Sequence, residues 1–348
     1  MKKNYPSPLI GILTSRKANG ALAGNGPLFI ELQKRLISLN GISFVFIPEE
    51  IEKDSIIGYQ FSPDDKCWFK KRFRYPDLVY NRIPFQKSEQ AESSQYLFSL
   101  LKERNIPFFN PCFIDKYELY LLLKNHDPLQ QYLPQTILAK DQEKLFSFLK
   151  NFNVLYLKPR YSSKGKGIFR LSIKGPGRIE LEGIKHKESF PSFKLFWKSW
   201  NKELLEKNYL AQEGIESEEY AGHRFDFRIL AHAEEDDFVI TGVGIRQSHK
   251  QGITTHIPAG GRLLPYHMLQ TTEHDQFMQA IVPHVGKALS AKLGFFGEFS
   301  IDAGVSKTGR YYIYEVNSKP MSFDETEIEE RKIEQLCRLF LQLTETQK

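Results

Sequence analysis

The stretch YIYEVNSKP at residues 312–320 decides how this chain is interpreted. Side chains alternate between the two faces of a strand, so Glu315 and Asn317 share one face. The segment GEFSID at residues 297–302 predicts a second strand that ends in Asp302, and a turn joins the two strands into a hairpin. Two carboxylates and one amide oxygen then lie close together, which suits a hard cation that bridges a polyphosphate. A hairpin with a polar, solvent-facing side is the alternative.

The stretch YLKPRYSSKGKGI at residues 156–168 predicts a strand that ends at Lys158, followed by a glycine-containing loop. Phosphate oxygens need a countercharge and close backbone N–H groups, which small residues allow. Lys164 and Lys166 supply further charge, although the loop is not a Walker A motif. The pattern indicates a phosphate site, with a solvated basic hairpin as an equally weighted alternative.

Charged residues also recur on the strands predicted between these two stretches. Asp226 and Arg228 share a strand face, either as a surface ion pair or with the arginine on a phosphate. Arg246 ends the next apolar strand. The order Lys-Pro strand, glycine loop, Asp-x-Arg, Arg, Asp and Glu-x-Asn is not expected from independent loops. It therefore favours one combined site.

Length and composition indicate a globular protein of two or three lobes. The chain has 348 residues, of which 41% are apolar and 26% charged, with a net charge of +6. The basic run at residues 70–74 is short and isolated, so it predicts a solvated loop in preference to a nucleic-acid patch. The three cysteines include no CxxC pair, which gives zinc and disulfides no support. No apolar run reaches about 18 residues, so we expect neither a signal peptide nor a membrane span.

Predicted strands and helices alternate in the first third of the chain, which predicts a mainly parallel α/β sheet. Its expected strands are residues 9–13, 42–47, 77–80 and 106–109, and its expected helices are 27–39 and 88–104. A second lobe is expected to contain helices 116–124, 142–152 and 193–207 and strands 136–139, 154–158, 168–173 and 209–212. The last third is expected to contain strands 224–231, 238–246, 297–305 and 311–316 and helices 277–293 and 325–343.

The chain resembles the ATP-grasp superfamily and, more narrowly, the YheC/YheD-like proteins described as endospore coat-associated. The stretches that carry the resemblance are PLIGILT (8–14), the run at 68–76, PDLVYNRIP (76–84), FFNP (108–111), the Lys158 loop and the hairpin at 302–320. The resemblance covers nearly the whole chain. It implies an α/β ATP-grasp fold, with α+β character in the ATP-grasp lobes. The implied domains are an N-terminal Rossmann-like pre-ATP-grasp domain (1–112), a central lid subdomain (113–208) and a C-terminal ATP-grasp domain (209–348).

The resemblance also implies ATP and two Mg²⁺ ions as cofactors, and a role for each matching residue. Residues 163–167 would close over the phosphates as a lid, and residues 213–215 would form the adenine hinge. The implied ATP contacts are Lys116, Lys158, Ser163, Gly165, Gly167, Glu213, Gly214, Ile215 and Asp226. Asp302, Glu315 and Asn317 would hold the metal ions. Arg228 and Arg246 would be catalytic and face the γ-phosphate and the transferring group.

Two features depart from the pattern of related ligases. Those ligases usually carry an asparagine a few residues before a Gly-Gly pair, but His256 precedes Gly260-Gly261 here. The segment between Glu213 and Asp226 is also long. The acidic residues in it that could meet the ribose are Glu216, Glu218 and Glu219.

The N-terminal lobe is expected to contribute acceptor specificity. Asn81 and Arg82 follow a predicted strand directly, at the edge where α/β sheets bind ligands. Arg82 would then bind a substrate carboxylate, and an ion pair with a neighbouring lobe is an equally weighted alternative.

The expected function is an ATP- and Mg²⁺-dependent carboxylate–amine or carboxylate–thiol ligase that forms an acyl phosphate and releases ADP. Its expected partners are small-molecule or peptide acid and amine substrates, with neither nucleic acid nor a membrane. The alternatives are a spore-associated structural or nucleotide-sensing protein with little turnover, and a kinase. A cytoplasmic location is expected, while a spore role, an association with the coat and a homo-oligomer are left open.

Overall fold

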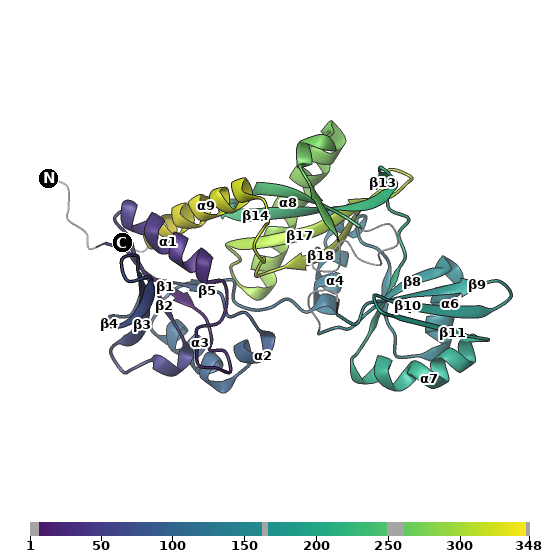
Figure 1. The fold of residues 1–348 in the computed structure, drawn as a ribbon, viewed down its shortest axis with the longest axis horizontal. Coiled ribbons are helices and arrows are strands. Elements are labelled where there is room, and N and C mark those ends of the chain that lie inside the picture. Colours follow the sequence, from purple (N-terminus) through teal and green to yellow (C-terminus); the bar gives the residue numbers. More distant parts are fainter. Residues whose placement is uncertain (1–6, 162–165, 249–260, 346–348) are drawn as a thin grey trace.

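The computed structural model describes residues 7–161, 166–248 and 261–345, and these form three lobes, each built on one sheet (Figure 1). The N-terminal sheet has the strand order β4 (Cys67–Phe73), β3 (Ile56–Ser62), β2 (Ile42–Phe46), β1 (Leu9–Leu13), β5 (Leu78–Asn81) and β6 (Phe108–Phe109). Strands β2, β1, β5 and β6 pair in parallel, so the expected parallel core is confirmed. Its helical elements are α1 (Gly26–Ser38), η1 (Pro48–Glu50), α2 (Gln86–Glu89) and α3 (Glu92–Glu103).

The prediction of a solvated loop at residues 70–74 was wrong, because most of this run lies in strand β4. β3 and β4 form an antiparallel hairpin at the edge of the sheet, and the side chains of β4 are largely exposed. An exposed edge strand has little apolar periodicity, so its sequence resembles that of a loop. The basic side chains are matched by acids, since Lys70 lies 2.7 Å from Glu50 and Arg72 lies 2.8 Å from Glu52.

The central lobe is an antiparallel sheet covered by two helices with a core of its own. Its strand order is β11 (His186–Phe190), β10 (Arg178–Gly183), β9 (Phe169–Lys174), β8 (Val154–Lys158), β12 (Leu210–Glu213) and β7 (Thr136–Leu138). The covering helices are α6 (Gln142–Phe152) and α7 (Phe193–Glu206). Strand β12 pairs with β8 and β7, so it belongs to this sheet although it follows the predicted domain boundary at 208/209. The three domain ranges stay a prediction.

The C-terminal lobe is an antiparallel sheet with one apolar face and one polar face. Its strands are β16 (Arg262–Leu264), β15 (Asp237–Gln247), β14 (His223–Glu234), β17 (Glu298–Val305) and β18 (Tyr311–Asn317), with β13 (Glu219–Tyr220) paired to β14. Its other elements are α4 (Lys116–Lys124), α5 (Asp127–Gln130), η3 (Tyr266–Met268), α8 (Thr272–Leu293) and α9 (Thr326–Glu345). Within the described ranges, none of the helices is both long and apolar enough to cross a membrane.

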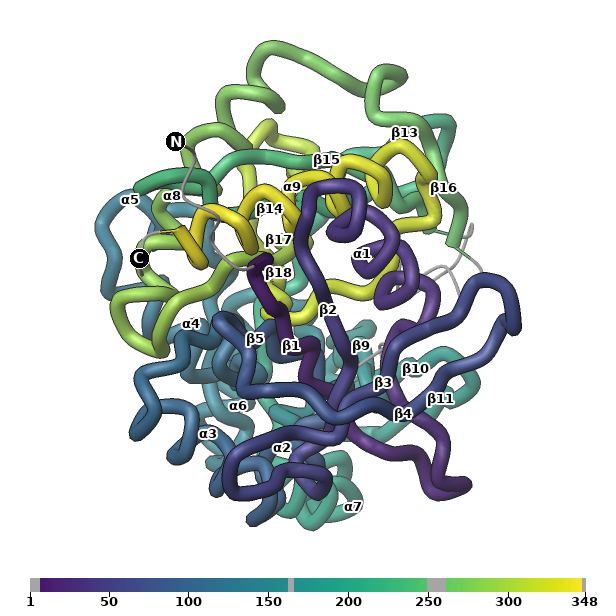
Figure 2. Tube along the Cα trace, turned by 90° about the vertical axis from the view of Figure 1, so that its left-hand side faces the viewer, coloured from purple at the N-terminus to yellow at the C-terminus, as the bar shows by residue number. Residues whose placement is uncertain are grey.

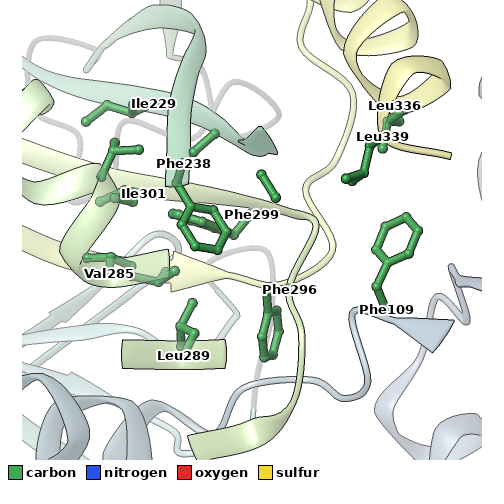
Figure 3. Packing of buried hydrophobic residues seen from close by; sticks show 14 of the residues in the cluster. Phe109, Ile229, Phe238, Val285, Leu289, Phe296, Phe299, Ile301, Leu336 and Leu339 are labelled. Carbon is green, nitrogen blue, oxygen red and sulfur yellow. The ribbon is translucent and has the colours of Figure 1, made fainter. Parts of the chain in front are cut away.

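The cores of the N-terminal and C-terminal lobes merge into one apolar cluster. Phe299 and Ile301 pack inside the C-terminal sheet, while Phe109 of β6 lies near Leu339 of α9 at the junction (Figure 3). Helix α9 packs beside α1, so the end of the chain covers the N-terminal lobe (Figures 1 and 2). These two lobes therefore share buried surface, whereas the central lobe encloses a separate cluster.

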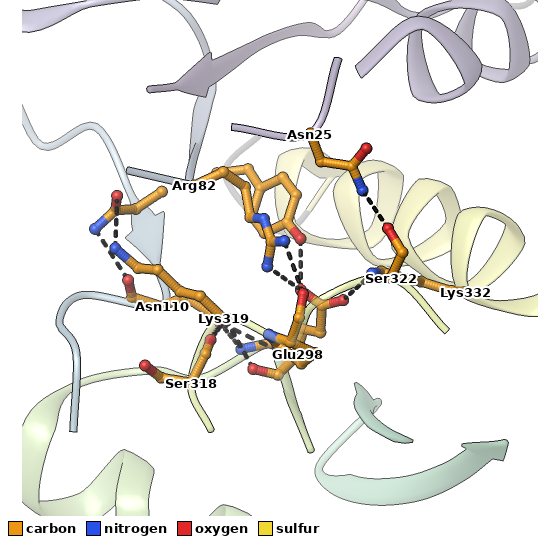
Figure 4. A network of polar contacts seen from close by, with 12 residues as sticks. Asn25, Arg82, Asn110, Glu298, Ser318, Lys319, Ser322 and Lys332 are labelled. Carbon is orange, nitrogen blue, oxygen red and sulfur yellow. Dashed lines mark hydrogen bonds and ion pairs between the residues drawn. The ribbon is translucent and has the colours of Figure 1, made fainter. Parts of the chain in front are cut away.

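A buried carboxylate, Glu298, lies where the N-terminal and C-terminal lobes meet (Figure 4). Its oxygens lie 3.2 Å from Arg82 Nη1 and 3.3 Å from Lys332 Nζ, and Tyr80 donates a hydrogen bond of 2.5 Å to it. Burial alone would raise the pKa of Glu298, but the Lys332 and Arg82 cations outweigh it and hold that pKa at about 2. Removing either cation would leave this buried charge with only one of its two compensating cations.

The segment that follows β18, which we call the strap (residues 318–322), is tied to the same edge of the N-terminal sheet. The Asn110 amide donates hydrogen bonds to the carbonyls of Ser318 and Glu298, and its oxygen accepts one from Gly297 N at 2.9 Å. Arg82 Nη2 donates to the carbonyl of Pro320 at 2.9 Å. The N-terminal lobe therefore holds the strap, which begins directly after Asn317, the last residue of β18.

Asn81 and Arg82 do not line the space between the lobes, so the predicted contact of Arg82 with a substrate carboxylate was wrong. Arg82 is only 8% exposed and forms the ion pair with a neighbouring lobe that was the alternative. Asn81 accepts a hydrogen bond from Lys319 of the strap at 3.1 Å, and the same lysine pairs with Glu89 of α2. Residues at the ends of parallel strands can contact another lobe or bind a ligand, and the sequence alone does not distinguish these two roles.

The imidazole of His232 adjoins Glu298 and should make the unfolding free energy depend on pH. Burial lowers the pKa of His232 to about 4, from an ordinary value near 6.5. The unfolded chain therefore binds more protons than the folded chain between these pH values, and stability falls as the pH drops through that window. Between pH 7 and pH 5, we expect the unfolding free energy of the unmodified protein to fall by about 2 kcal/mol more than that of His232→Gln. Urea unfolding at both pH values measures this difference, with His267→Gln, at an exposed position, as the control. Equal pH dependence in all three proteins would contradict the assignment.

Candidate active site

A cavity of about 470 Å³ lies between the lobes, and most of the residues that the sequence singled out line it. Those that line it are Lys116, Lys158, Glu213, Ile215, Asp226, Arg228, Arg246, Asp302, Glu315 and Asn317. Ser163, Gly165, His256 and Gly260 lie outside the described residues. A cavity of this size with few, convergent polar groups is typical of a small-molecule site.

Gly167 and Gly214 are described but do not line the cavity, and each has a local structural reason to be glycine. Gly167 adopts a positive φ of 73°, and its carbonyl accepts a hydrogen bond from Tyr209. Gly214 donates to the carbonyl of Val154 at 2.9 Å, and a Cβ there would lie 2.9 Å from that carbonyl oxygen. Both glycines shape the backbone around β8.

The hairpin of β17 and β18 brings the expected metal ligands together. Asp302 is paired with Glu315 in the strand register, and Asn317 Nδ2 lies 3.4 Å from Asp302 Oδ2. A bulge next to Asp302 interrupts the alternation, so Tyr314 lines the cavity too, whereas strict alternation would place it on the face opposite Glu315. The donor set of two carboxylates and one amide oxygen fits Mg²⁺, which keeps water and substrate phosphates among its ligands. Accordingly, the described residues contain no cluster of three or more His, Cys, Asp or Glu side chains that could form a protein-only metal cage.

Two lysines from different lobes face this hairpin. Lys116, at the start of α4, lies 3.0 Å from Glu315, and Lys158, at the end of β8, donates to Gln212 Oε1 at 2.6 Å. Burial lowers the pKa of Lys158, and Lys116 lowers it further, while Glu315 acts in the opposite direction. Two converging cations in a partly buried place favour binding of an anion such as a polyphosphate.

The start of α4 connects the central lobe to the hairpin of β17 and β18. Asp115 caps α4 by accepting hydrogen bonds from two backbone amides of the first turn. Its other oxygen accepts a hydrogen bond of 2.6 Å from Arg160, which follows β8. The neighbouring Lys116 contacts Glu315, so one helical turn touches the central and C-terminal lobes at the cavity.

Arg228 and Arg246 lie side by side on the polar face of the C-terminal sheet. The register pairs Arg228 with Asp302 and Arg246 with Asp226 across neighbouring strands. Arg228 is 6% exposed and Arg246 is 9% exposed, yet neither forms an ion pair within 4.0 Å among the described residues. The Nε of Arg228 also lacks a hydrogen-bond partner there, and burial together with the nearby Arg228 lowers the pKa of Arg246. Two buried guanidinium groups that repel each other form a site for an anion.

The cavity is also lined by residues that the sequence analysis did not single out. They include Tyr156, Gln212, Ser217, Arg224 and Tyr314. Tyr156 and Lys158 are two residues apart on one strand, as are Arg224 and Asp226, so strand alternation could have indicated both additions. None of the three acids proposed for the ribose lines the cavity, and Glu219 instead pairs with Lys307 at 3.0 Å.

Comparison with known proteins identifies relatives of this chain. The family model described as YheC/D-like ATP-grasp matches residues 105–345. The endospore coat-associated protein YheD of Bacillus subtilis is 25% identical over 332 residues, which cover 90% of this chain and 72% of YheD. YheC of the same organism is 24% identical over 309 residues, covering 83% of this chain and 84% of YheC.

Among solved structures, the fold is similar to that of the ATP-grasp ligase PsnB complexed with a minimal precursor. The TM-score is 0.58 at 13% identity, and the match covers 97% of this chain and 100% of that one. Such a low identity establishes the fold alone. Since the family match extends over well more than half of the chain, the protein belongs to the YheC/D-like ATP-grasp family and has the fold of ATP-dependent ligases.

Proposed function

We propose that the protein is an ATP- and Mg²⁺-dependent carboxylate–amine ligase that works through an acyl phosphate. The observation that carries the proposal is the buried pair Arg228 and Arg246, which has no acidic ion-pair partner among the described residues and lies beside Asp302. Transfer of the γ-phosphoryl group to a carboxylate brings two anions together. Fixed guanidinium groups stabilise such a transfer by position and charge.

Each residue of the cavity then has a chemical task. Lys116 and Lys158 bind the phosphates, and residues 213–215 with Asp226 hold the nucleoside. Mg²⁺ bound to Asp302, Glu315 and Asn317 would offset phosphate charge. Arg228 and Arg246 orient the substrate carboxylate in line with the γ-phosphorus.

The reaction balances without a protein nucleophile. A carboxylate oxygen attacks the γ-phosphorus and ADP leaves, which gives the acyl phosphate. The amine nitrogen then attacks the acyl carbon, inorganic phosphate leaves with the bonding electrons, and the amine loses a proton. Water must be kept from the acyl phosphate, because hydrolysis would waste it.

The relatives agree with this proposal in kind. PsnB, which shares the fold, is described in complex with a phosphomimetic variant of its minimal precursor, Mg and ADP. Both curated relatives are called endospore coat-associated, so we place the substrates among the amino acids or peptides that a sporulating cell provides. A thiol acceptor in place of an amine would need the same first step.

Glu315→Gln keeps the shape of the side chain but removes the carboxylate charge proposed to hold Mg²⁺. We expect the rate of Mg²⁺-dependent ADP formation to fall about 100-fold, because an amide binds Mg²⁺ more weakly and less phosphate charge would be offset at the transferring group. The assay resolves ADP from AMP and adds panels of amino acids and short peptides as acids and acceptors. Glu219→Gln is the control, since Glu219 pairs with Lys307 outside the cavity. ATP binding without turnover under any condition would refute the ligase and favour a nucleotide-sensing protein.

Arg228→Met should separate binding from chemistry. We expect ATP affinity to change only a few-fold, while kcat falls about 100-fold, since the guanidinium is proposed to act on the transferring phosphoryl group. Nucleotide binding by calorimetry and turnover are compared with Arg262→Met, an exposed position on β16. Unchanged kcat would remove Arg228 from the mechanism.

Asn110→Ala should weaken Mg²⁺ binding although Asn110 lies in the neighbouring lobe, because its side chain holds the strap that follows Asn317. Residues that orient metal ligands typically change metal affinity about 10- to 100-fold when removed. We expect the Mg²⁺ concentration for half-maximal ADP formation to rise about 10-fold at saturating ATP. Asn151→Ala, at an exposed position of α6, is the control. A loss of thermal stability with an unchanged Mg²⁺ requirement would show that Asn110 only supports the fold.

A further inference from the structure

Three exposed apolar side chains meet at the cavity from three different lobes. They are Phe85 before α2, Tyr161 after β8 and Met321 in the strap, with exposures of 56%, 57% and 46%. Single exposed apolar residues are ordinary on a protein surface, but three that line one cavity indicate a bound group or a contact between lobes. Figure 1 shows α2 at the edge of the N-terminal lobe that faces the rest of the molecule.

Phe85 and Met321 come from other parts of the chain than the residues proposed to hold the nucleoside. Met321 lies in the strap, four residues after Asn317, whereas Glu213 ends β12 of the central lobe and Ile215 follows it. Other apolar residues that line the cavity include Pro84, Phe113 and Ile114. We therefore assign a group bound against Phe85 and Met321 to the second substrate and not to ATP.

The charged residues that lie close in sequence to Met321 and Tyr161, which are Lys319 and Arg160, already have partners. Lys319 pairs with Glu89, and both side chains are almost fully buried. Arg160 pairs with Asp115 at 2.6 Å. A charged substituent would have to be desolvated against Phe85 and Met321 without a counterion from these groups, which is unfavourable. An apolar substituent loses no such hydration and gains by burying its surface.

We propose that the carboxylic acid activated by this enzyme carries an uncharged, apolar substituent that packs on Phe85 and Met321. The inference rests on the proposed ligase function, in which Arg228 and Arg246 hold the reacting carboxylate. The substrate class is an aliphatic or aromatic amino acid, or a peptide that ends in one. Contact between the lobes alone is the competing explanation for the same apolar residues.

Hydroxylamine separates recognition of the acid from recognition of the amine. Its nitrogen attacks the acyl carbon and phosphate leaves, so any activated acid gives a hydroxamate. The full-length enzyme with ATP and Mg²⁺ is supplied with leucine, phenylalanine, asparagine or aspartate, each free and as the C-terminal residue of a dipeptide. We expect kcat/KM about 10-fold or more higher for the apolar acids than for asparagine and aspartate.

Phe85→Ser and Met321→Ser should each lower kcat/KM for the apolar acids about 10-fold and change the value for asparagine little. Phe85→Lys should raise the relative rate with aspartate, because it adds a counterion. Tyr96→Ser is the matched control, since Tyr96 is 65% exposed on α3 of the same lobe and does not line the cavity.

The outcomes separate this inference from the function on which it rests. Hydroxamate formed preferentially from aspartate or asparagine would overturn the apolar substrate class and leave the ligase intact. An equal loss with all acids in Phe85→Ser and Met321→Ser would also overturn it, in favour of lobe contact. No hydroxamate and no ADP with any acid would refute the ligase itself, and the inference with it.

Discussion

The ion pairs around Glu298 constrain the whole arrangement of the site. Cations stabilise this fully buried carboxylate in its charged form, and they come from different parts of the chain, since Arg82 directly follows β5 and Lys332 lies in α9. Pairing Glu298 with both cations therefore requires the N-terminal and C-terminal lobes to meet at one place. There, Asn110 and Arg82 form hydrogen bonds with the strap and fix the chain directly after Asn317. The end of the β17–β18 hairpin is thus fixed by residues that do not line the cavity.

The charge pattern of the site follows from the alternation of side chains along β-strands. Four neighbouring antiparallel strands present every second residue on one face, and the register aligns Arg246 with Asp226 and Arg228 with Asp302. The opposite face of the same strands is the apolar core with Phe299 and Ile301 (Figure 3). One sheet therefore supplies both the stability and the charge pattern, and the two lysines are added from elements outside it.

The sequence was most informative where local pattern and tertiary role coincide. Strands β1 and β8 and helix α4 have the predicted bounds, because apolar runs and the N-cap Asp115 define them locally. The paired strands β17 and β18 were also foreseen, since a turn separates two alternating segments. Most site residues followed from the same alternation together with the family resemblance.

What escaped prediction depends on partners that are distant in sequence. Strands β4 and β11 are polar edge strands, so their pairing with β3 and β10 leaves little trace in composition. The bulge that turns Tyr314 into the cavity requires knowledge of the register. The role of Arg82 depends on Glu298, which lies 216 positions further along the chain. No local pattern could separate that ion pair from a contact with substrate.

The separate core of the central lobe has a consequence for movement. The lobe joins the rest of the chain next to β7 and β12, and Lys158 and Glu213 lie on strands at this side of its sheet. Strands β9, β10 and β11 lie progressively further from the joint. If the lobe rotates there as a rigid body, displacement grows with distance from the axis, so the far strands swing widely while Lys158 and the hinge shift least. Such a rotation would open the cavity widely while Lys158 and Glu213 stay almost in place.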